Sequence, residues 1–199
     1  MIIARNDITG LILSGGRGSR MGGIDKGLQP YRGQTLVAHA LERLGPQVGT
    51  LMVNANRNLD RYRTLGVPVW SDEVPGYAGP LAGMLAGLAH CETTFLATVP
   101  CDTPHFPLDL VARLTQGLQS ADADIAVACT RSGAELSPQP VFCLIKTSLT
   151  DALAAFIAAG ELRTGSFALG QRNTRVVFDQ AAEFLNINTL AELHHAQPP

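Results

Sequence analysis

The sequence predicts one α/β domain, a three-layer α/β/α sandwich built on a mostly parallel sheet. The first observation is that short apolar runs alternate with amphipathic helical stretches along the whole chain. The second is length, because 199 residues suffice for one packed core and leave little for a second. The third is composition, since 46% hydrophobic and 16% charged residues are typical of an ordinary globular protein. We therefore expect 1–199 to form a single domain.

Four apolar runs in the first half of the chain predict buried strands, at 8–13, 48–53, 67–70 and 94–99. Apolar residues at helical spacing predict the helices between them, at 35–44, 58–65 and from Pro80 to Leu88. Pro80 suits a first helical position, because its missing N–H is one of the donors that lack a helical partner there.

The same alternation continues through the second half of the chain. Helices are expected over 107–118 and 147–159, and Thr189 with Glu192 forms a capping box for a last short helix. Strands are expected at 124–129, 140–145, 175–178 and 183–187. Helices should then cover both faces of the sheet, with ligands at the carboxyl ends of the strands.

Charge and composition exclude several classes of protein. A net charge of -2 gives no general attraction to nucleic acid or to an anionic membrane, so anion binding has to be local. The apolar start of the chain is interrupted by Arg5, too early for a secretory signal, and no run approaches a membrane span. The four cysteines lie far apart without a C-x-x-C pair, so neither a disulfide framework nor a zinc site is expected. The sequence thus predicts a cytoplasmic protein without nucleic-acid or membrane partners.

A glycine-rich segment at 13–26 follows the first predicted strand. Its five glycines let the backbone bring N–H groups close to an anion, and Arg17, Arg20 and Lys26 add positive charge. The spacing fits neither of two common phosphate motifs: position 21 is not the glycine of a dinucleotide fingerprint, and Asp25 precedes the lysine where a P-loop has glycine. Taken alone, the segment leaves a flexible surface loop as an equal alternative.

The glycine-rich segment resembles the signature of the molybdenum cofactor guanylyltransferases, and it reads Leu-Ser-Gly-Gly-x-Gly-x-Arg-Met-Gly-Gly-x-Asp-Lys-Gly from position 13. This family belongs to the nucleotidyltransferases with a glycosyltransferase-A-like, Rossmann-like fold. Four further segments match in the family's order, at 53–57, 79–84, 100–104 and 186–189. The resemblance covers nearly the whole chain and is weakest over about 130–175.

The resemblance implies transfer of GMP from GTP to the terminal phosphate of molybdopterin, with release of pyrophosphate. It implies Mg²⁺ as cofactor, with Mn²⁺ as a substitute, and transient contact with molybdenum-insertion proteins or molybdoenzymes. A GTP-binding half is expected at about 1–105 and a pterin-side half at about 106–199. The double glycine at 15 and 16 resembles guanylyl enzymes, whereas related cytidylyl enzymes tend to carry Ala-Ala-Gly there.

Asp102 is the candidate metal ligand. It follows the strand at 94–99 and lies between Pro100 and Pro104, which restrict the backbone around it. Mg²⁺ commonly takes one or two carboxylates together with phosphate oxygens and water, although an Asp-Thr-Pro sequence can equally be a helix cap. In the family this aspartate is the metal ligand. Arg20, Lys26 and Asp102 are therefore the expected catalytic residues.

The resemblance implies nucleotide contacts at the ends of neighbouring strands, by Leu13, Ser14, Gly15, Gly16, Lys26, Asn54, Asp72 and Asp102. Asn54 and Asp72 are expected to contact the guanosine, although both residue types also favour turns and caps. Asp25, next to Lys26, is expected to orient the lysine.

The resemblance places six residues on the pterin side, namely Pro80, Leu81, Gly83, Arg163, Asn186 and Asn188. Asn186 and Asn188 would project from one face of a strand, whereas Gly83 could instead serve only to thin a helix for packing. The stretch 131–140 resembles a mobile loop over the cleft, and Gln139 stands where some relatives have histidine.

Three alternatives stay open at this point. A CTP-dependent molybdenum cofactor cytidylyltransferase, or a transferase acting on a sugar phosphate, would use the same loop. A non-catalytic nucleotide or cofactor carrier would also bind GTP but would release no pyrophosphate. The guanylyl transfer that the resemblance implies needs no protein nucleophile, because a phosphate monoester is already anionic at neutral pH.

Overall fold

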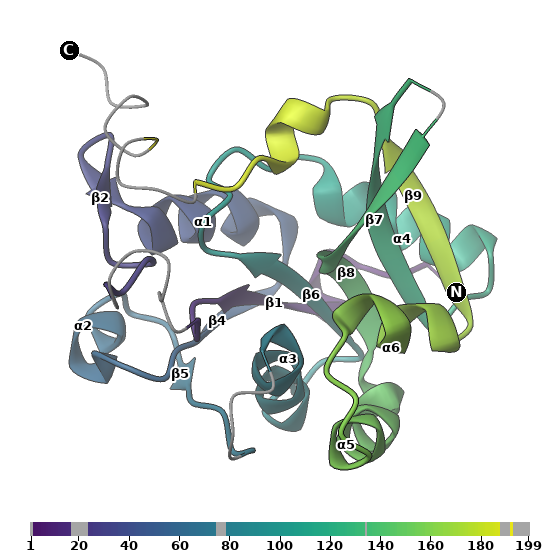
Figure 1. The fold of residues 1–199 in the computed structure, drawn as a ribbon, viewed down its shortest axis with the longest axis horizontal. Helices are drawn as coiled ribbons and strands as arrows, with labels where there is room; N and C mark the ends of the chain where they lie inside the picture. Colours follow the sequence, from purple (N-terminus) through teal and green to yellow (C-terminus); the bar gives the residue numbers. More distant parts are fainter. Residues whose placement is uncertain (1, 17–23, 75–78, 134, 188–191, 193–199) are drawn as a thin grey trace.

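A central sheet runs through the molecule in the strand order β5-β4-β1-β6-β8-β7-β9 (Figure 1). The computed structural model describes residues 2–16, 24–74, 79–133, 135–187 and 192, and within them the sheet has seven strands. These are β1 (Ile8–Leu13), β4 (Thr50–Asn54), β5 (Val69–Trp70), β6 (Phe95–Pro100), β7 (Ile125–Ser132), β8 (Glu135–Lys146) and β9 (Asn173–Phe178). Only β8 is antiparallel to its neighbours, so the sheet is mostly parallel, as the sequence predicts.

Helices cover both faces of this sheet. One core cluster packs the sheet against α1 (Leu36–Leu44), α2 (Leu59–Arg63) and α4 (Leu110–Ser120). The other packs it against α3 (Pro80–Ala89), α5 (Thr150–Ala158) and α6 (Thr164–Gly170). Figure 1 shows α3, α5 and α6 together on one side, with α1 and α4 on the opposite side. The predicted three-layer α/β/α arrangement is confirmed.

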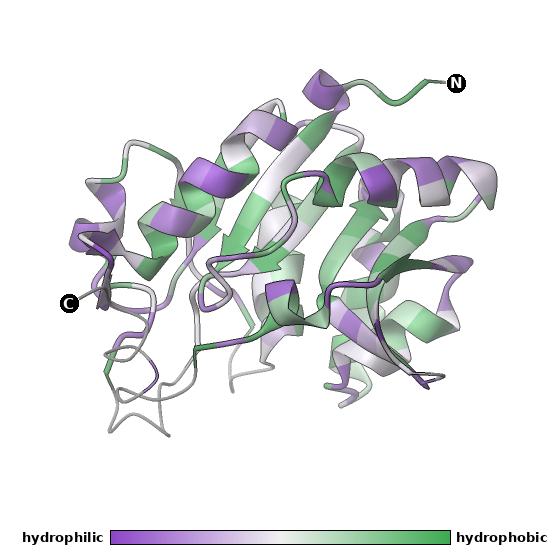
Figure 2. Ribbon diagram, turned by 90° about the horizontal axis from the view of Figure 1, so that it is seen from above, coloured by the Kyte–Doolittle hydropathy of each residue, from purple (hydrophilic) through white to green (hydrophobic). Residues whose placement is uncertain are grey.

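The central strand β1 explains why the sequence shows continuous apolar runs instead of alternation. All six of its residues are buried. Ile8 and Ile12 belong to one core cluster, whereas Leu11 and Leu13 belong to the other. A strand that is covered on both faces needs apolar residues at both odd and even positions, because these point to opposite faces. Figure 2 accordingly shows apolar residues concentrated on the strands and polar ones on the outer helical surfaces.

The strand order creates a switch point between β1 and β6. The chain moves from β1 to β4 and then β5 in one direction, and returns through α3 to place β6 on the other side of β1. In an open parallel sheet, loops at such a point leave the two strand ends in opposite directions and open a crevice. The fold therefore directs attention to the carboxyl ends of β1 and β6.

The elements differ from the prediction in several places, and some were not predicted at all. The helix expected from Pro107 begins at Leu110, after a turn in which the Leu110 N–H donates to the Pro107 carbonyl. The two-strand hairpin of β2 (Pro30–Tyr31) and β3 (Gln34–Thr35), and the helix α6, were not predicted. Four short 3₁₀ helices complete the regular structure that the structure describes: Arg5–Asp7, Gly45–Gln47, Thr147–Leu149 and Ala181–Phe184.

Two sequence predictions are wrong. The stretch 131–140 is not a loop, because β7 runs to Ser132 and β8 begins at Glu135, so the two strands form a long hairpin. No strand forms at 183–187; Ala181–Phe184 is a 3₁₀ helix, and the ring of Phe184 packs edge-on against Phe142. Burial of that ring, instead of sheet pairing, anchors the segment. The capping box at Thr189 lies outside the described residues.

None of the described helices combines the length and the apolar character that crossing a bilayer requires. The longest of them, α4, has 11 residues and alternates buried with exposed positions.

A cluster of charged side chains, Asp122, Asp124, Lys146 and Arg172, leads to a prediction about stability. Asp124 accepts hydrogen bonds from Lys146 Nζ at 2.8 Å and from Arg172 Nε at 2.8 Å. The bonds from Arg172 and Lys146 hold the pKa of the Asp124 carboxyl well below its usual range. A group with a lowered folded pKa contributes stability above its unfolded pKa of about 3.9, and the contribution is lost as pH falls.

Asp124→Asn is expected to lower the free energy of unfolding by about 1 kcal/mol at neutral pH, as for a paired surface charge. The difference from the original protein should shrink as pH falls below about 4, because protonation of Asp124 then weakens in the original protein the same interactions that the variant lacks. Urea unfolding at several pH values measures it. Asp122→Asn is the control, since that carboxylate is 88% exposed and lies 3.3 Å from Arg172 Nη1. A pH-independent difference would contradict the prediction.

Candidate active site

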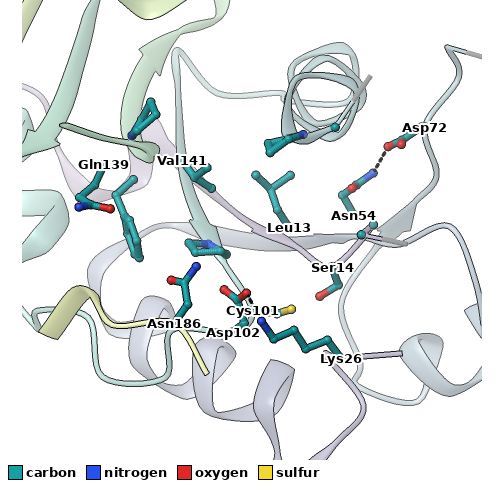
Figure 3. A pocket seen from close by; sticks show the side chains of 17 residues that line it. Leu13, Ser14, Lys26, Asn54, Asp72, Cys101, Asp102, Gln139, Val141 and Asn186 are labelled. Atoms are coloured by element: carbon teal, nitrogen blue, oxygen red, sulfur yellow. Dashed lines mark hydrogen bonds and ion pairs between the residues drawn. The ribbon is translucent and has the colours of Figure 1, made fainter. Parts of the chain in front are cut away.

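A cavity of about 600 Å³ opens at the carboxyl ends of β1, β4 and β6 (Figure 3). The loops after these strands, the loop before α3 and the middle of β8 form its walls. The described residues that line it are Leu13, Ser14, Gly15, Gly16, Lys26, Asn54, Asp72, Gly79, Pro80, Pro100, Cys101, Asp102, Gln139, Pro140, Val141, Phe142 and Asn186. All eight residues expected to bind the nucleotide therefore share one cavity.

The register of the sheet brings these strand ends level. Leu13 at the end of β1 pairs with Asn54 on one side and with Pro100 on the other. The ladders continue one residue further, with Ser14 N–H donating to the Asn54 carbonyl at 2.8 Å and Cys101 N–H donating to the Leu13 carbonyl at 3.1 Å. Three segments far apart in sequence thus present their next side chains at one edge.

Lys26 and Asp102 form an ion pair at this edge. Lys26 Nζ donates to Asp102 Oδ2 at 2.7 Å, and the two side chains are 19% and 17% exposed. Such a partly buried pair is screened less by salt than a surface pair. The Asp102 backbone is held as well, because its carbonyl accepts from Ile187 N–H at 2.8 Å. The structure therefore brings the predicted lysine and the predicted metal ligand into direct contact.

The donor set around Asp102 fits a magnesium ion bound mainly through its substrate. Lys26 occupies Oδ2, whereas Oδ1 has only a long contact, 3.5 Å, from the Thr103 hydroxyl. The described residues contain no group of three or more His, Cys, Asp or Glu side chains placed to hold a metal. Mg²⁺ suits this situation, because it commonly binds one or two carboxylates and takes its other ligands from phosphates and water.

A second polar network lies on the other side of the cavity. Asn54 is only 2% exposed, and its amide donates to Asp72 Oδ1 at 2.8 Å and to the Trp70 carbonyl at 3.2 Å. Asn56 donates to Asp72 Oδ2 at 2.7 Å, so each carboxylate oxygen of Asp72 accepts one amide N–H. A carboxylate fixed by two donors keeps its remaining lone pairs for a ligand. Figure 3 shows Asn54 and Asp72 across the cavity from Gln139.

Both described ends of the glycine-rich segment are tied to the chain that follows β4. The Gly15 carbonyl accepts from Asn56, and the Gly16 carbonyl accepts from Arg57 Nη2 at 3.1 Å. At the other end, the Asp25 carboxylate accepts from the Tyr62 hydroxyl at 2.6 Å and from the Asn58 amide at 2.9 Å.

These bonds change the interpretation of Asp25. Its carboxylate oxygens face Tyr62 and Asn58, so its role is to anchor the segment to α2. Lys26 is oriented by Asp102 instead. Arg20, an expected catalytic residue, lies outside the described residues.

Two nucleophilic side chains beside the cavity stay protonated. Burial, and then the neighbouring Asp102 carboxylate, raise the pKa of the Cys101 thiol to about 12. Burial, together with Cys101 and Asp25, raises the pKa of the Tyr62 hydroxyl far above its usual range. The thiolate is the nucleophilic form of cysteine, so Cys101 does not act as a nucleophile near neutral pH.

A bulge in β8 forms the wall opposite Asp72. Val127 pairs with Cys143 and the next residue, Ala128, pairs with Gln139, so Pro140–Phe142 have no partner on β7. Bulges redirect side chains and are common beside active sites. The carbonyl of Val141 is held by the Thr98 hydroxyl at 2.6 Å. The sequence offered one signal for this wall, because a proline inside a strand marks an edge or a bulge.

The residues expected on the pterin side do not lie together. Pro80 and Asn186 line the cavity, and Thr103 donates a 2.6 Å hydrogen bond to Asn186 Oδ1. Leu81 is fully buried in the core, so we attribute packing to its side chain. Arg163 is exposed at the start of α6 and is not one of the lining residues. Asn188 lies outside the described residues, and its expected strand does not form at 183–187.

Gly83 lies beneath the side of the cavity that Asn54 and Asp72 form. A Cβ atom at this position would overlap Asn54 Oδ1 and would approach Leu13 Cδ2 to 2.7 Å. The glycine thus leaves space for the Asn54 amide that holds Asp72. The alternative in which Gly83 serves close packing within a helix agrees with this placement.

Gly83→Ala is expected to displace Asn54 and to lower stability by about 1–3 kcal/mol, as overpacking of a core does. Steady-state kinetics should show a higher KM for the nucleotide with little change in KM for the second substrate. Gly87→Ala, on the same helix, is the control because its Cβ would meet Leu11 and Leu96 in the core instead. A selective rise in KM for the second substrate would contradict the packing role and favour direct contact with that substrate.

Comparisons with known proteins identify a family and similar proteins for this chain. Residues 10–175 match the family described as MobA-like NTP transferase domain. The chain is 59% identical over 192 residues to the molybdenum cofactor guanylyltransferase of Bordetella petrii, covering 96% of this chain and 98% of that protein. It is 54% identical to the molybdenum cofactor guanylyltransferase of Cupriavidus necator, covering 96% and 97%.

Solved structures show the same fold at low sequence identity. Molybdopterin-guanine dinucleotide biosynthesis protein A from Archaeoglobus fulgidus superposes with a TM-score of 0.74 at 22% identity, covering 95% of this chain and 96% of that one. The 4-diphosphocytidyl-2C-methyl-D-erythritol synthase from Anaerococcus prevotii gives a TM-score of 0.72 at 11% identity, covering 97% of each chain. Both likenesses concern the fold alone.

Proposed function

The chain belongs to the MobA-like NTP transferase family, and from this premise we propose that it transfers GMP from GTP to the terminal phosphate of molybdopterin. Pyrophosphate leaves, and molybdopterin guanine dinucleotide is formed. The observation that carries the proposal is the Lys26–Asp102 ion pair, which lines the same cavity as Ser14, Gly15 and Gly16. The high identity to full-length guanylyltransferases supports GTP as the nucleotide.

The reaction needs alignment and charge neutralisation more than covalent catalysis. A phosphate oxygen of molybdopterin forms a bond to the α-phosphorus of GTP, and the bond from that phosphorus to the bridging oxygen of the β-phosphate breaks. The bonding electron pair leaves with pyrophosphate. The acceptor phosphate is already anionic at neutral pH, and the raised pKa of Cys101 removes the nearest thiol as a nucleophile.

Lys26 and backbone N–H groups of the glycine-rich segment supply the positive charge from the protein. The lysine ammonium has three donors, so it can keep Asp102 as a partner while it binds a phosphate oxygen. Asp102 would hold Mg²⁺ through its carboxylate, and the bound cation would neutralise negative charge on the phosphates. Arg20 is proposed to act beside Lys26.

The two ends of the cavity suit the two substrates. We assign the nucleoside of GTP to the side of Asn54 and Asp72, and molybdopterin to the side of Pro80, Asn186 and the β8 bulge. Apart from Pro80, this assignment follows the predicted division into a GTP-binding half at about 1–105 and a pterin-side half at about 106–199. A cytoplasmic location and transient contacts with molybdenum-insertion proteins or molybdoenzymes remain predictions from the sequence.

The decisive experiment incubates the purified protein with Mg²⁺, GTP and molybdopterin, and identifies the product by mass spectrometry together with pyrophosphate release. Parallel reactions with CTP and UTP test the nucleotide, and chelation followed by addition of Mg²⁺ or Mn²⁺ tests the cation. Product from CTP but not GTP would indicate a cytidylyltransferase. GTP binding without pyrophosphate release would indicate a carrier.

A further inference from the structure

Asn56 links Gly15 and Asp72, which lie on the side of the cavity that we assign to the nucleotide. Its amide nitrogen donates to Asp72 Oδ2 at 2.7 Å and to the Gly15 carbonyl at 3.2 Å. Its amide oxygen accepts from the Asp72 backbone N–H at 2.8 Å. One side chain thus holds both the carboxylate and the backbone of Asp72, and the first carbonyl of the double glycine.

The contact between Asn56 and the glycine-rich segment is close. A Cβ atom on Gly15 would lie 2.7 Å from Asn56 Nδ2 and 2.8 Å from Asn54 Oδ1. The backbone at Gly15 therefore rests directly against the two amides. Asn56 itself does not appear among the lining residues of the cavity, so it acts on a ligand only through Gly15 and Asp72.

We propose that Asn56 is a positioning residue that fixes the distance between the phosphate-binding backbone at Gly15 and the nucleoside-side carboxylate of Asp72. This inference rests on the proposed function, because it takes GTP as the ligand that spans both sides. GTP reaches from one contact to the other, so both must be correctly spaced before it binds. Preorganisation of this kind lowers the cost of ordering the site, and a misplacement of about 1 Å can reduce the rate by ~10²-fold.

The surrounding bonds explain why Asn56 has no substitute. Asp72 Oδ1 already accepts from Asn54, whose amide also donates to the Trp70 carbonyl. Arg57 Nη2 donates to the next carbonyl along the segment, that of Gly16. Among the described side chains, Asn56 is the one that hydrogen-bonds to both Gly15 and Asp72.

The first test is Asn56→Ala. We expect the KM for GTP to rise about 10- to 100-fold, with an unchanged KM for molybdopterin and a protein that remains folded by circular dichroism. Direct titration should show a parallel loss of GTP affinity. A general loss of structure would instead change both KM values together. Wild-type KM for GTP in a folded variant would overturn the inference.

The second test is Asn56→Asp, which keeps the shape but replaces the amide donor by an oxygen. At about pH 8 this oxygen would face Asp72 Oδ2 and the Gly15 carbonyl, and GTP affinity should fall as in the alanine variant. Two facing carboxylates raise one of their pKa values, so a shared proton restores a donor as pH falls. We therefore expect the deficit relative to wild type to shrink towards about pH 5.

The comparison with wild type at each pH cancels the contribution of the other charged groups and of the histidine in this region. Arg57, Glu73 and His90, of which the last two lie 3.5 Å apart, are present in both proteins. Asn173→Asp is the matched control, because the Asn173 amide also donates to backbone carbonyls but lies on β9. A deficit that is constant with pH, or equal in the control, would overturn the inference. Failure of wild type to form product would instead overturn the proposed function.

Discussion

Asp102→Ala is expected to lower product formation from GTP by ~10²- to 10³-fold, the cost typical of losing a preorganised charge-stabilising contact. The change removes the carboxylate that we assign to Mg²⁺ and also removes the partner of Lys26, 2.7 Å away. Both losses affect charge in the reaction more than they affect the core, because the side chain lies at the cavity edge. Initial rates at several Mg²⁺ concentrations measure the effect.

The design needs a carboxylate control and a test of the cation. Asp60→Ala serves as control, since Asp60 is 96% exposed and, among the described residues, forms an ion pair only with Arg63. Asp102→Asn keeps the shape of the side chain and should lose activity nearly as strongly, because an amide is a poor ligand for Mg²⁺. Near-normal turnover of Asp102→Ala at saturating Mg²⁺ would refute the assignment.

Lys26→Ala is expected to lower kcat/KM for GTP by about 10²-fold, because the cavity loses a lining lysine that we assign to the triphosphate and Asp102 is left without its counterion. The loss should appear largely in the GTP dependence. Lys26→Arg restores the charge but not the compact shape of the ammonium, so it should recover only part of the activity.

The chain provides a matched control for this experiment. Its other lysine, Lys146, pairs with Asp124 away from the cavity. Lys146→Ala should lower thermal stability while it leaves the KM for GTP unchanged. A double variant of Lys26 and Asp102 should lose less activity than the two single changes predict together, because the two side chains interact. An unchanged GTP dependence of Lys26→Ala would remove this residue from the site.

Strands and helices were predictable where they depend on local pattern. Runs such as 8–13 and 95–99 are buried on both faces, so apolar residues dominate them without a regular alternation and the strand is evident from the sequence. The 3₁₀ helix at Ala181–Phe184 was missed because its position depends on the ring of Phe184 packing in the core, which no neighbouring residue specifies.

The candidate site likewise has features that the local sequence determines and features that it does not. The sequence by itself determined that a glycine-rich turn follows a buried strand, that Asp102 follows another, and that the motifs resemble one family. Each of these depends on residues close together in the chain. Backbone sterics and apolar spacing act over a few residues, and they leave a direct trace in the sequence.

Only the tertiary structure decided which side chains meet. Lys26 contacts Asp102 across 76 positions, Asn56 contacts Gly15 across 41, and the β8 bulge faces the ends of β1 and β6. These contacts depend on strand order and register, which follow from burying two cores at once. That choice is a property of the whole packed chain, so the role of Asp25 as an anchor and of Asn56 as a link could not be inferred from their neighbours.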